Sequence, residues 1–349
     1  MKILLLILFL IINFIPQNYV TLKIYLMSGL LVFWIFYVLG FIWHVQKDRA
    51  VKNKFEKHLY IKDIPTVRTV VEVGYLLHGK IHSSMLGTSI IELVRKKALL
   101  LRYNPKDKDY VFIYNNVGSE KLTYAEKFLL DWLLSKIGNG QRVTFAHIKK
   151  DARTNSAYFL SCYENWNTLA SFEGAKPNFF ETKNNVVDGT IGFIVLSIIL
   201  ALLGLYNHLP TPLIIASLFA TLILIIYINS FYLRTKEGNS EYSRWVSFSH
   251  SIKRGDACNN ISDLSSLERV IVYSKLMNQN TDKMMTTILT KDGCPFDNSE
   301  FIMYARSGII DEICSKINKL VPTALLVSFV FARNKGSRAS VKYKRKEEA

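Results

Sequence analysis

The sequence lacks the local motifs that carry most enzyme chemistry. It contains no phosphate-binding P-loop, no glycine-rich dinucleotide fingerprint, no HExxH, no GxSxG and no kinase-type motif. His78 and His82 are four residues apart, but Gly79 lies between them and no glutamate stands in the position of a general base, so a turn without a ligand role is favoured. We therefore expect no catalytic residue, no cofactor and no metal, and a protein that is not an enzyme.

Cysteine is also scarce. The four cysteines are far apart, none forms a CxxC pair and no histidine accompanies them at zinc-ligand spacing. They are Cys162, Cys258, Cys294 and Cys314. All four fall in segments that we assign to the cytosol, where thiols stay reduced, so we expect free thiols.

Acidic residues are outnumbered by basic ones, 28 to 44, which gives a formal net charge of +16 over 349 residues. Such an excess fits a nucleic-acid partner, an anionic lipid surface, or cytoplasmic loops that obey the positive-inside rule. The third explanation is favoured because long charge-free blocks alternate with very basic ones. The charge pattern thus argues first for a membrane protein.

The blocks without charge predict membrane segments. Residues 24–45 have the length of a spanning helix, and the basic residues that follow place the next part of the chain inside. Residues 190–233 are interrupted by a proline turn, which predicts a transmembrane hairpin with both ends inside. Residues 1–22 have no cleavage site and indicate a signal anchor or a short first span. Asp188 is expected to cap the hairpin at the interface rather than act as an intramembrane carboxylate.

The remaining chain is expected on the cytosolic side, in three parts. Residues 46–187 are predicted to form an α+β domain, residues 234–332 a mainly helical region, and residues 333–349 a basic disordered tail that at most touches lipid. The apolar patch at 320–332 is too short to span a bilayer and is expected to be interfacial or packed.

Helix and hairpin signals alternate within residues 46–187. Helices are predicted near 69–77, ended by Gly79, and through 89–97, followed by a hairpin over 99–114. A capping box of Thr123 and Glu126 opens a second cycle, with an extended piece at 142–145 and a long helix from about 153 to 171. Short helices followed by a hairpin are typical of a winged helix. The expected fold class is therefore a helical membrane protein with tandem winged-helix-like modules.

Four fragments carry a resemblance to a known family. They are residues 73–81, 90–99, 122–127 and 234–248, with Gly74, Tyr75, Leu76, Gly79, Arg234, Gly238 and Trp245 as the matching signature positions. In this order they resemble the YciQ-like predicted bacterial membrane proteins, which share a domain of unknown function (DUF2207). The resemblance covers roughly residues 60–280 and implies a multi-pass protein of the bacterial cell membrane, but no activity. The extracellular β-rich region usual in that family is missing between the first two apolar segments, so the chain resembles a shortened member.

Arg95, Lys96 and Lys97 end the second predicted helix and are candidate phosphate or lipid contacts. The base-reading positions of such a helix, which include Thr88 and Glu92, make a poor nucleic-acid face, so a solvated or lipid-facing basic surface is favoured. Trp245 and Phe248 are expected to pack or to anchor at a membrane surface rather than to bind a ligand.

These observations favour a membrane-tethered protein-interaction or regulatory module without enzymatic activity. Its expected partners are the lipid bilayer and a protein that the sequence does not identify. The alternative is a membrane-tethered regulator that binds nucleic acid.

Overall fold

The computed structural model describes residues 20–53, 63–116, 122–180, 234–255, 263–279 and 299–329, together with scattered positions between 191 and 225. The chain divides into two compact units. Unit 1 comprises Met1–Lys57 and Phe180–Asn239, and unit 2 comprises His58–Phe179 and Ser240–Ala349. The predicted segments at 1–19 and 333–349, Asp188, Cys258 and Cys294 lie outside the described residues.

Unit 1 contains the long helix α2 (Val20–Asn53), within which the apolar stretch 24–45 lies. An isolated antiparallel bridge joins Phe180 to Arg234, and the Arg234 guanidinium lies 5.6 Å from the centre of the Phe180 ring. No helix in the described part of the chain combines the length and the apolarity that a membrane crossing requires.

Unit 2 begins with two helices, of which the first has a local side-chain cap at its N-terminus and the second does not. Helix α3 (Val70–His78) opens with a capping box between Thr69 and Glu72 and ends at Gly79, whose φ of 71° is left-handed. Helix α4 (Met85–Arg95) is buried from its first residue to Val94, and the side chain of the preceding Ser84 does not cap it. Since no face of α4 up to Val94 is open to solvent, this helix lies in the core of unit 2.

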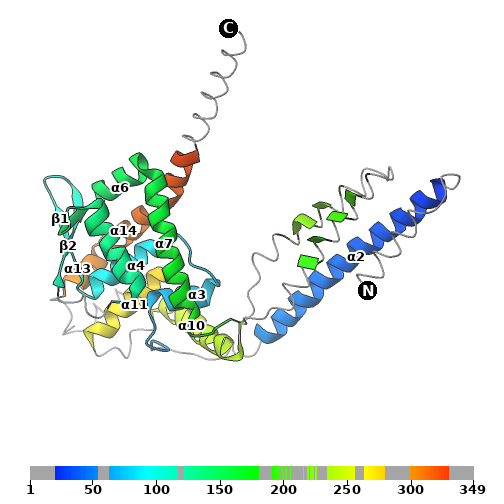
Figure 1. The fold of residues 1–349 in the computed structure, drawn as a ribbon. Helices are drawn as coiled ribbons and strands as arrows, with labels where there is room; N and C mark the ends of the chain where they lie inside the picture. The colour runs from blue at the N-terminus through cyan, green and yellow to red at the C-terminus, as the bar shows by residue number, and fades with distance from the viewer. Residues whose placement is uncertain are drawn as a thin grey trace, which may run out of the picture. The chain divides into compact units, whose positions relative to one another are not determined.

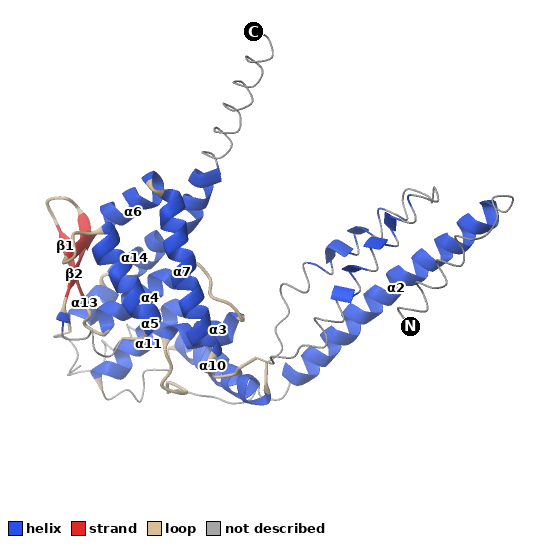
Figure 2. Ribbon diagram, in the orientation of Figure 1, coloured by secondary structure: helices blue, strands red, loops and turns tan. Residues whose placement is uncertain are grey.

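A small sheet follows (Figure 2). Strands β1 (Leu99–Asn104) and β2 (Asp109–Tyr114) form an antiparallel hairpin, which confirms that prediction. Strand β3 (Arg142–Thr144) pairs with the other edge of β2, with Val143 opposite Phe112. Both cycles of the predicted domain therefore contribute to the same three-stranded sheet, in the order β1-β2-β3.

Helices make up the rest of unit 2 (Figure 1). In chain order they are α5 (Tyr124–Asp131), the π-helix η4 (Trp132–Ile137), α6 (Phe145–Thr154), α7 (Ser156–Ala175), α10 (Lys236–Arg254, with its first residues in unit 1), α11 (Leu264–Leu276), α13 (Glu300–Arg306) and α14 (Ile309–Asn318). Residues 320–329 are also helical. The predicted long helix at 153–171 is wrong in its start, because a break at Asn155 separates α6 from α7.

Helix α4 lies among α3, α5, α11 and α14, and α7 packs against α3 and α5. Aromatic side chains fill the space between helices: the rings of Trp245 and Tyr273 are 4.8 Å apart, and those of Trp132 and Phe159 are 5.0 Å apart. Trp245 also stacks edge-on against Phe248, and both are fully buried. Aromatic burial of this kind is a large share of the hydrophobic stabilisation of a domain.

The expected fold class is therefore corrected. Tandem winged-helix-like modules would each carry their own wing and an exposed recognition helix, whereas β3 joins the sheet of the first cycle and α4 is buried. The membrane-spanning helices of that expectation are not found among the described residues, and most of the predicted hairpin at 190–233 lies outside them. Within its described ranges the protein is mainly helical, with one three-stranded sheet.

Candidate functional site

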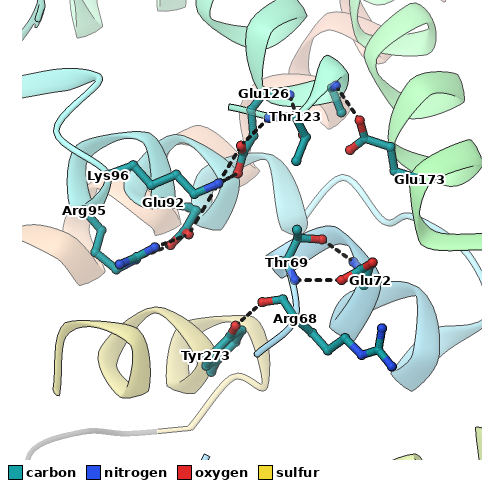
Figure 3. Close-up of polar contacts among 11 residues, drawn as sticks. Arg68, Thr69, Glu72, Glu92, Arg95, Lys96, Thr123, Glu126, Glu173 and Tyr273 are labelled. Carbon is teal, nitrogen blue, oxygen red and sulfur yellow. Dashed lines mark hydrogen bonds and ion pairs between the residues drawn. The ribbon is translucent and has the colours of Figure 1, made fainter. Parts of the chain in front are cut away.

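The predicted cations at the end of α4 belong to a buried polar cluster, which we define as Glu92, Arg95, Lys96 and Glu126 (Figure 3). Arg95 donates two hydrogen bonds to Glu92, each 2.7 Å long, and Lys96 Nζ lies 2.6 and 2.7 Å from the Glu126 oxygens. Burial opposes the charge of Arg95, but the hydrogen bonds and charge of Glu92 outweigh it and raise the pKa of Arg95. Two cations thus neutralise two carboxylates in the protein interior.

The Glu126 carboxylate pairs with Lys96 in the cluster and also caps the start of a helix. The Thr123 amide donates to Glu126 Oε2 at 2.9 Å, and the Glu126 amide donates to Thr123 Oγ1 at 3.3 Å. This confirms the capping box predicted for the second cycle. One carboxylate therefore fixes the start of α5 and, through Lys96, ties it to the end of α4.

The side of the cluster nearest α11 carries a further acidic group. Burial raises the pKa of Glu268, against the lowering effect of the hydrogen bond that it accepts from Ser299 and of the Arg95 and Lys97 charges. Lys97 itself is exposed and has a left-handed backbone, with φ of 58°. Arg95 and Lys96 thus have partners inside the chain, and the phosphate or lipid contact of the three cations stays a prediction.

The signature residues on α3 and its C-cap lie at packing positions of unit 2. A Cβ on Gly74 would lie 1.9 Å from Met85 Cε, so the absence of a side chain lets α3 approach α4. Tyr75 packs where Gly174 of α7 has no side chain, with 2.5 Å between the Tyr75 Cβ and an added Cβ at Gly174. Leu76 is fully buried.

The other signature residues lie at the ends of elements or in the core. The Gly79 amide donates to the Tyr75 carbonyl at 2.7 Å, and its left-handed φ ends α3. Trp245 is fully buried. In unit 1, the Gly238 amide donates to Thr235 Oγ1 at 3.0 Å, and Arg234 covers Phe180. These contacts are structural in kind.

The histidine pair and the cysteines offer little chemistry. The rings of His78 and His82 are 5.1 Å apart and edge-on, and burial, followed by the charge of Lys80, lowers the pKa of His82. Within the described residues, no three histidine, cysteine or acidic side chains come together in a group that could hold a metal ion. Cys162 and Cys314 are free and buried, and burial raises the pKa of the Cys314 thiol to about 12.

His78 also lines an open cavity of about 590 Å³ between α3, α10 and α11. Its wall combines apolar side chains such as Val246 and Leu276 with polar ones such as Tyr242 and His250. The chain places no cluster of catalytic or ligating groups there, so the cavity by itself indicates no reaction.

A feature that sequence reasoning missed is a basic groove of about 460 Å³ between the β1–β2 turn, α6 and α14. Its cations are Lys108, Lys149, Arg153, Lys316 and Lys319. The pairs Lys149–Arg153 and Lys316–Lys319 have helical spacing, but the sequence does not indicate that α6 and α14 line the same groove. Only the fold brings these charges to one place.

The walls of the basic groove are fixed by polar contacts. Asp109 accepts a hydrogen bond from the Ala146 amide at 2.9 Å, which holds the hairpin against the start of α6. Lys316 pairs with Glu312 and lies 5.3 Å from the centre of the Tyr110 ring, while the Tyr110 hydroxyl donates to Glu312. Hydrogen bonds from Lys316 and Tyr110 lower the pKa of Glu312. These contacts join the hairpin to α6 and to α14 around the groove.

A second surface feature is an aromatic clip, which we define as Tyr124, Phe172 and Lys176. Tyr124 and Phe172 are 73% and 68% exposed, although one stands at the start of α5 and the other near the end of α7. The Lys176 ammonium lies 6.0 and 5.4 Å from their ring centres. Glu173 accepts a hydrogen bond from the Ala125 amide at 3.1 Å and so joins the two helices beside the clip.

Comparison with known proteins gives one match. A family model described as "Predicted membrane protein (DUF2207) C-terminal domain" matches residues 57–277, more than half of the chain. No curated protein and no solved structure matches.

Proposed function

The chain belongs to the DUF2207 family of predicted membrane proteins, and we propose that it is a non-enzymatic, membrane-tethered module that binds a protein partner through the aromatic clip of unit 2. In this proposal the protein is multi-pass and most of the chain lies in the cytosol. The observation that carries it is the exposure of two large aromatic side chains, Tyr124 and Phe172, on a fixed helical surface.

Unit 1 supports the membrane part of the proposal. Exposed apolar side chains share one face of α2, and they include Tyr25, Phe33, Phe36 and Trp43. Isolated apolar side chains on a protein surface need no explanation, but a contiguous apolar face requires a partner surface. Lipid supplies such a surface for α2.

The aromatic clip has the features of a binding hot spot. Tyrosine and phenylalanine bring a large apolar area at little cost in side-chain entropy, and aromatic residues are enriched at protein interfaces. Lys176 lies close to both rings, and the contact between Glu173 and Ala125 restrains the helices that carry them. A partner would therefore meet a surface that is already ordered, which lowers the entropic cost of binding.

No specific observation favours the nucleic-acid alternative. Thr88, Ser89 and Glu92, which would face the bases in a recognition helix, are buried in α4. A helix in the core cannot enter a groove of DNA without unfolding unit 2.

Photo-crosslinking in native membranes tests the proposal. A photoreactive amino acid is placed at Lys127, an exposed position one turn along α5 from Tyr124, in the full chain expressed in its own host. We expect a discrete crosslinked protein band that is lost when Tyr124→Ala and Phe172→Ala are combined. The matched control is Tyr158→Ala, a half-exposed tyrosine on α7 outside the clip.

Two results would count against the proposal. One is a crosslinked band that persists unchanged in the double variant. The other is a band that the control variant removes to the same extent, because such a loss would follow from a general change in α7 rather than from the clip.

A further inference from the structure

The helical residues 320–329 have two distinct faces. Leu320, Val321 and Ala324 are buried against unit 2. Leu325, Leu326 and Phe329, which we call the apolar strip, are 53%, 69% and 72% exposed. Within unit 2, this strip is the place where a described helix presents three large apolar side chains to solvent within five positions.

The same helix forms part of the basic groove. Leu320 and Thr323 line the groove together with Lys149, Arg153 and Lys319. Lys316 pairs with Glu312, whereas no carboxylate in the described part of the chain forms an ion pair with Lys149, Arg153 or Lys319. Asp107 and Asp109 also line the groove, but its five cations outnumber these two carboxylates. The helix therefore has excess positive charge beside one part of its surface and exposed hydrocarbon on another.

We propose that the basic groove and the apolar strip together form a docking face for an anionic lipid surface. Lys149, Arg153 and Lys319 contact lipid phosphates, while the apolar strip enters the boundary between headgroups and acyl chains. Interfacial amphipathic helices bind membranes in the same way, because their cations and their buried apolar area both contribute to binding. The face acts independently of the aromatic clip, which lies on α5 and α7.

Charge and hydrophobicity together select lipid among anionic partners. A nucleic acid or a free phosphate would use the cations but would leave the apolar strip in water. The sequence that follows adds to the same chemistry, because the stretch 330–349 contains Arg333, Lys335, Arg338, Lys342, Lys344, Arg345 and Lys346 against Glu347 and Glu348. A polybasic stretch next to an apolar anchor provides the two signals that stable attachment to an anionic leaflet needs.

The test uses the full chain reconstituted into vesicles, with a fluorescent reporter beside the apolar strip. Ser328→Cys carries the label, in a background where Cys258 and Cys294 are replaced by serine and the buried Cys162 and Cys314 are retained. Vesicles consist of phosphatidylcholine alone or of phosphatidylcholine mixed with phosphatidylglycerol, each with a trace of nitroxide-labelled lipid as a quencher. Quenching reports whether position 328 touches the bilayer.

We expect strong quenching in the anionic vesicles at low salt, and much less in phosphatidylcholine alone or at high salt. Combining Lys149→Glu, Arg153→Glu and Lys319→Glu should lower the ratio of docked to undocked protein by at least about tenfold. The charge-matched control combines Lys136→Glu, Arg142→Glu and Lys150→Glu, which are exposed in unit 2 but do not line the groove, and should leave quenching nearly unchanged. Combining Leu326→Ser and Phe329→Ser should also reduce quenching.

Three outcomes would overturn the proposal. Equal quenching in both types of vesicle would show that the cations are not needed, and absence of quenching in both would show that the face does not dock. An equal loss in the groove variant and its control would show that only total charge matters. The groove and strip substitutions are on the surface of unit 2, and an unchanged thermal unfolding midpoint verifies that they leave the fold intact.

Discussion

Replacing Gly87 by alanine introduces a methyl group between two helices of unit 2 that are far apart in the sequence. An added Cβ would lie 2.7 Å from Asn318 Oδ1, 3.0 Å from Cys314 Cα and 3.1 Å from the Cys314 carbonyl oxygen. Two of these atoms belong to the backbone of α14, which cannot rotate away. The Gly87 amide also donates to Asn318 Oδ1 at 3.2 Å, so Asn318 caps α4 in the place where Ser84 does not.

The expected magnitude follows from opposing contributions. Alanine is a better helix former than glycine by about 1 kcal/mol, which favours the variant. Overpacking of a filled interior costs about 1–3 kcal/mol, and loss of a cap costs about 1 kcal/mol more. The net result is a destabilisation of about 1–3 kcal/mol, or a fall in the unfolding midpoint of roughly 2–12 °C for a unit of this size.

Thermal unfolding of the full chain in detergent, followed by tryptophan fluorescence, measures this shift. Asn318→Ala removes the cap without adding a methyl group, so we expect it to cost less than Gly87→Ala. Ser89→Ala is the matched control on α4, because the buried Ser89 hydroxyl has no hydrogen-bond partner and its removal should be neutral or stabilising. If Gly87→Ala unfolds at or above the midpoint of the parent protein, the close approach of α4 and α14 inferred here is refuted.

Three further variants test other contacts in the same unfolding assay. Gly74→Ala should cost less than Gly87→Ala, since the nearest atom is the flexible end of Met85, and equal losses would contradict this distinction. Lys96→Met should cost about 3 kcal/mol because it leaves the buried Glu126 carboxylate without its countercharge, and adding Glu126→Gln should restore most of that loss; no recovery would refute the pairing. Glu268→Gln should stabilise unit 2 at neutral pH. Because the carboxyl pKa is raised in the folded state, the stability of the parent protein falls as the pH rises from the ordinary glutamate pKa of 4.5 to the raised pKa. A variant with the same pH dependence as the parent would exclude Glu268 as the cause.

Short-range features of unit 2 could be predicted from the sequence. The capping box of Thr123 and Glu126 was predicted because the two residues lie three positions apart and satisfy backbone amides of the first helical turn. The box of Thr69 and Glu72 has the same spacing but was not predicted. Gly79 predicted the end of α3, because the left-handed backbone conformation that ends many helices favours glycine. In all three cases the interacting atoms are neighbours in the chain.

The architecture depends on contacts between distant residues, and there the prediction was wrong. A hairpin after two helices fits a winged helix. That assignment also requires the second helix to be exposed, and the local sequence does not show whether another element covers it. The strand β3, some thirty residues beyond the hairpin, completes the sheet, and α14 covers α4. The basic groove was missed for the same reason, because Lys149 and Lys319 become neighbours only when α6 and α14 pack near the hairpin turn.

Helices α4 and α5 of unit 2 each receive a capping group from a helix that is distant in the sequence. These caps help to identify which helices belong to the folded unit. Asn318 caps α4, and Glu173 accepts a hydrogen bond from the start of α5. The family match ends at residue 277, yet α14, which provides Asn318 and covers α4, lies beyond it. A fragment cut at residue 277 would expose the apolar side chains of α4 and leave its first turn without this cap. The helices after residue 277 therefore belong to the folded unit, and they also carry the apolar strip and part of the basic groove.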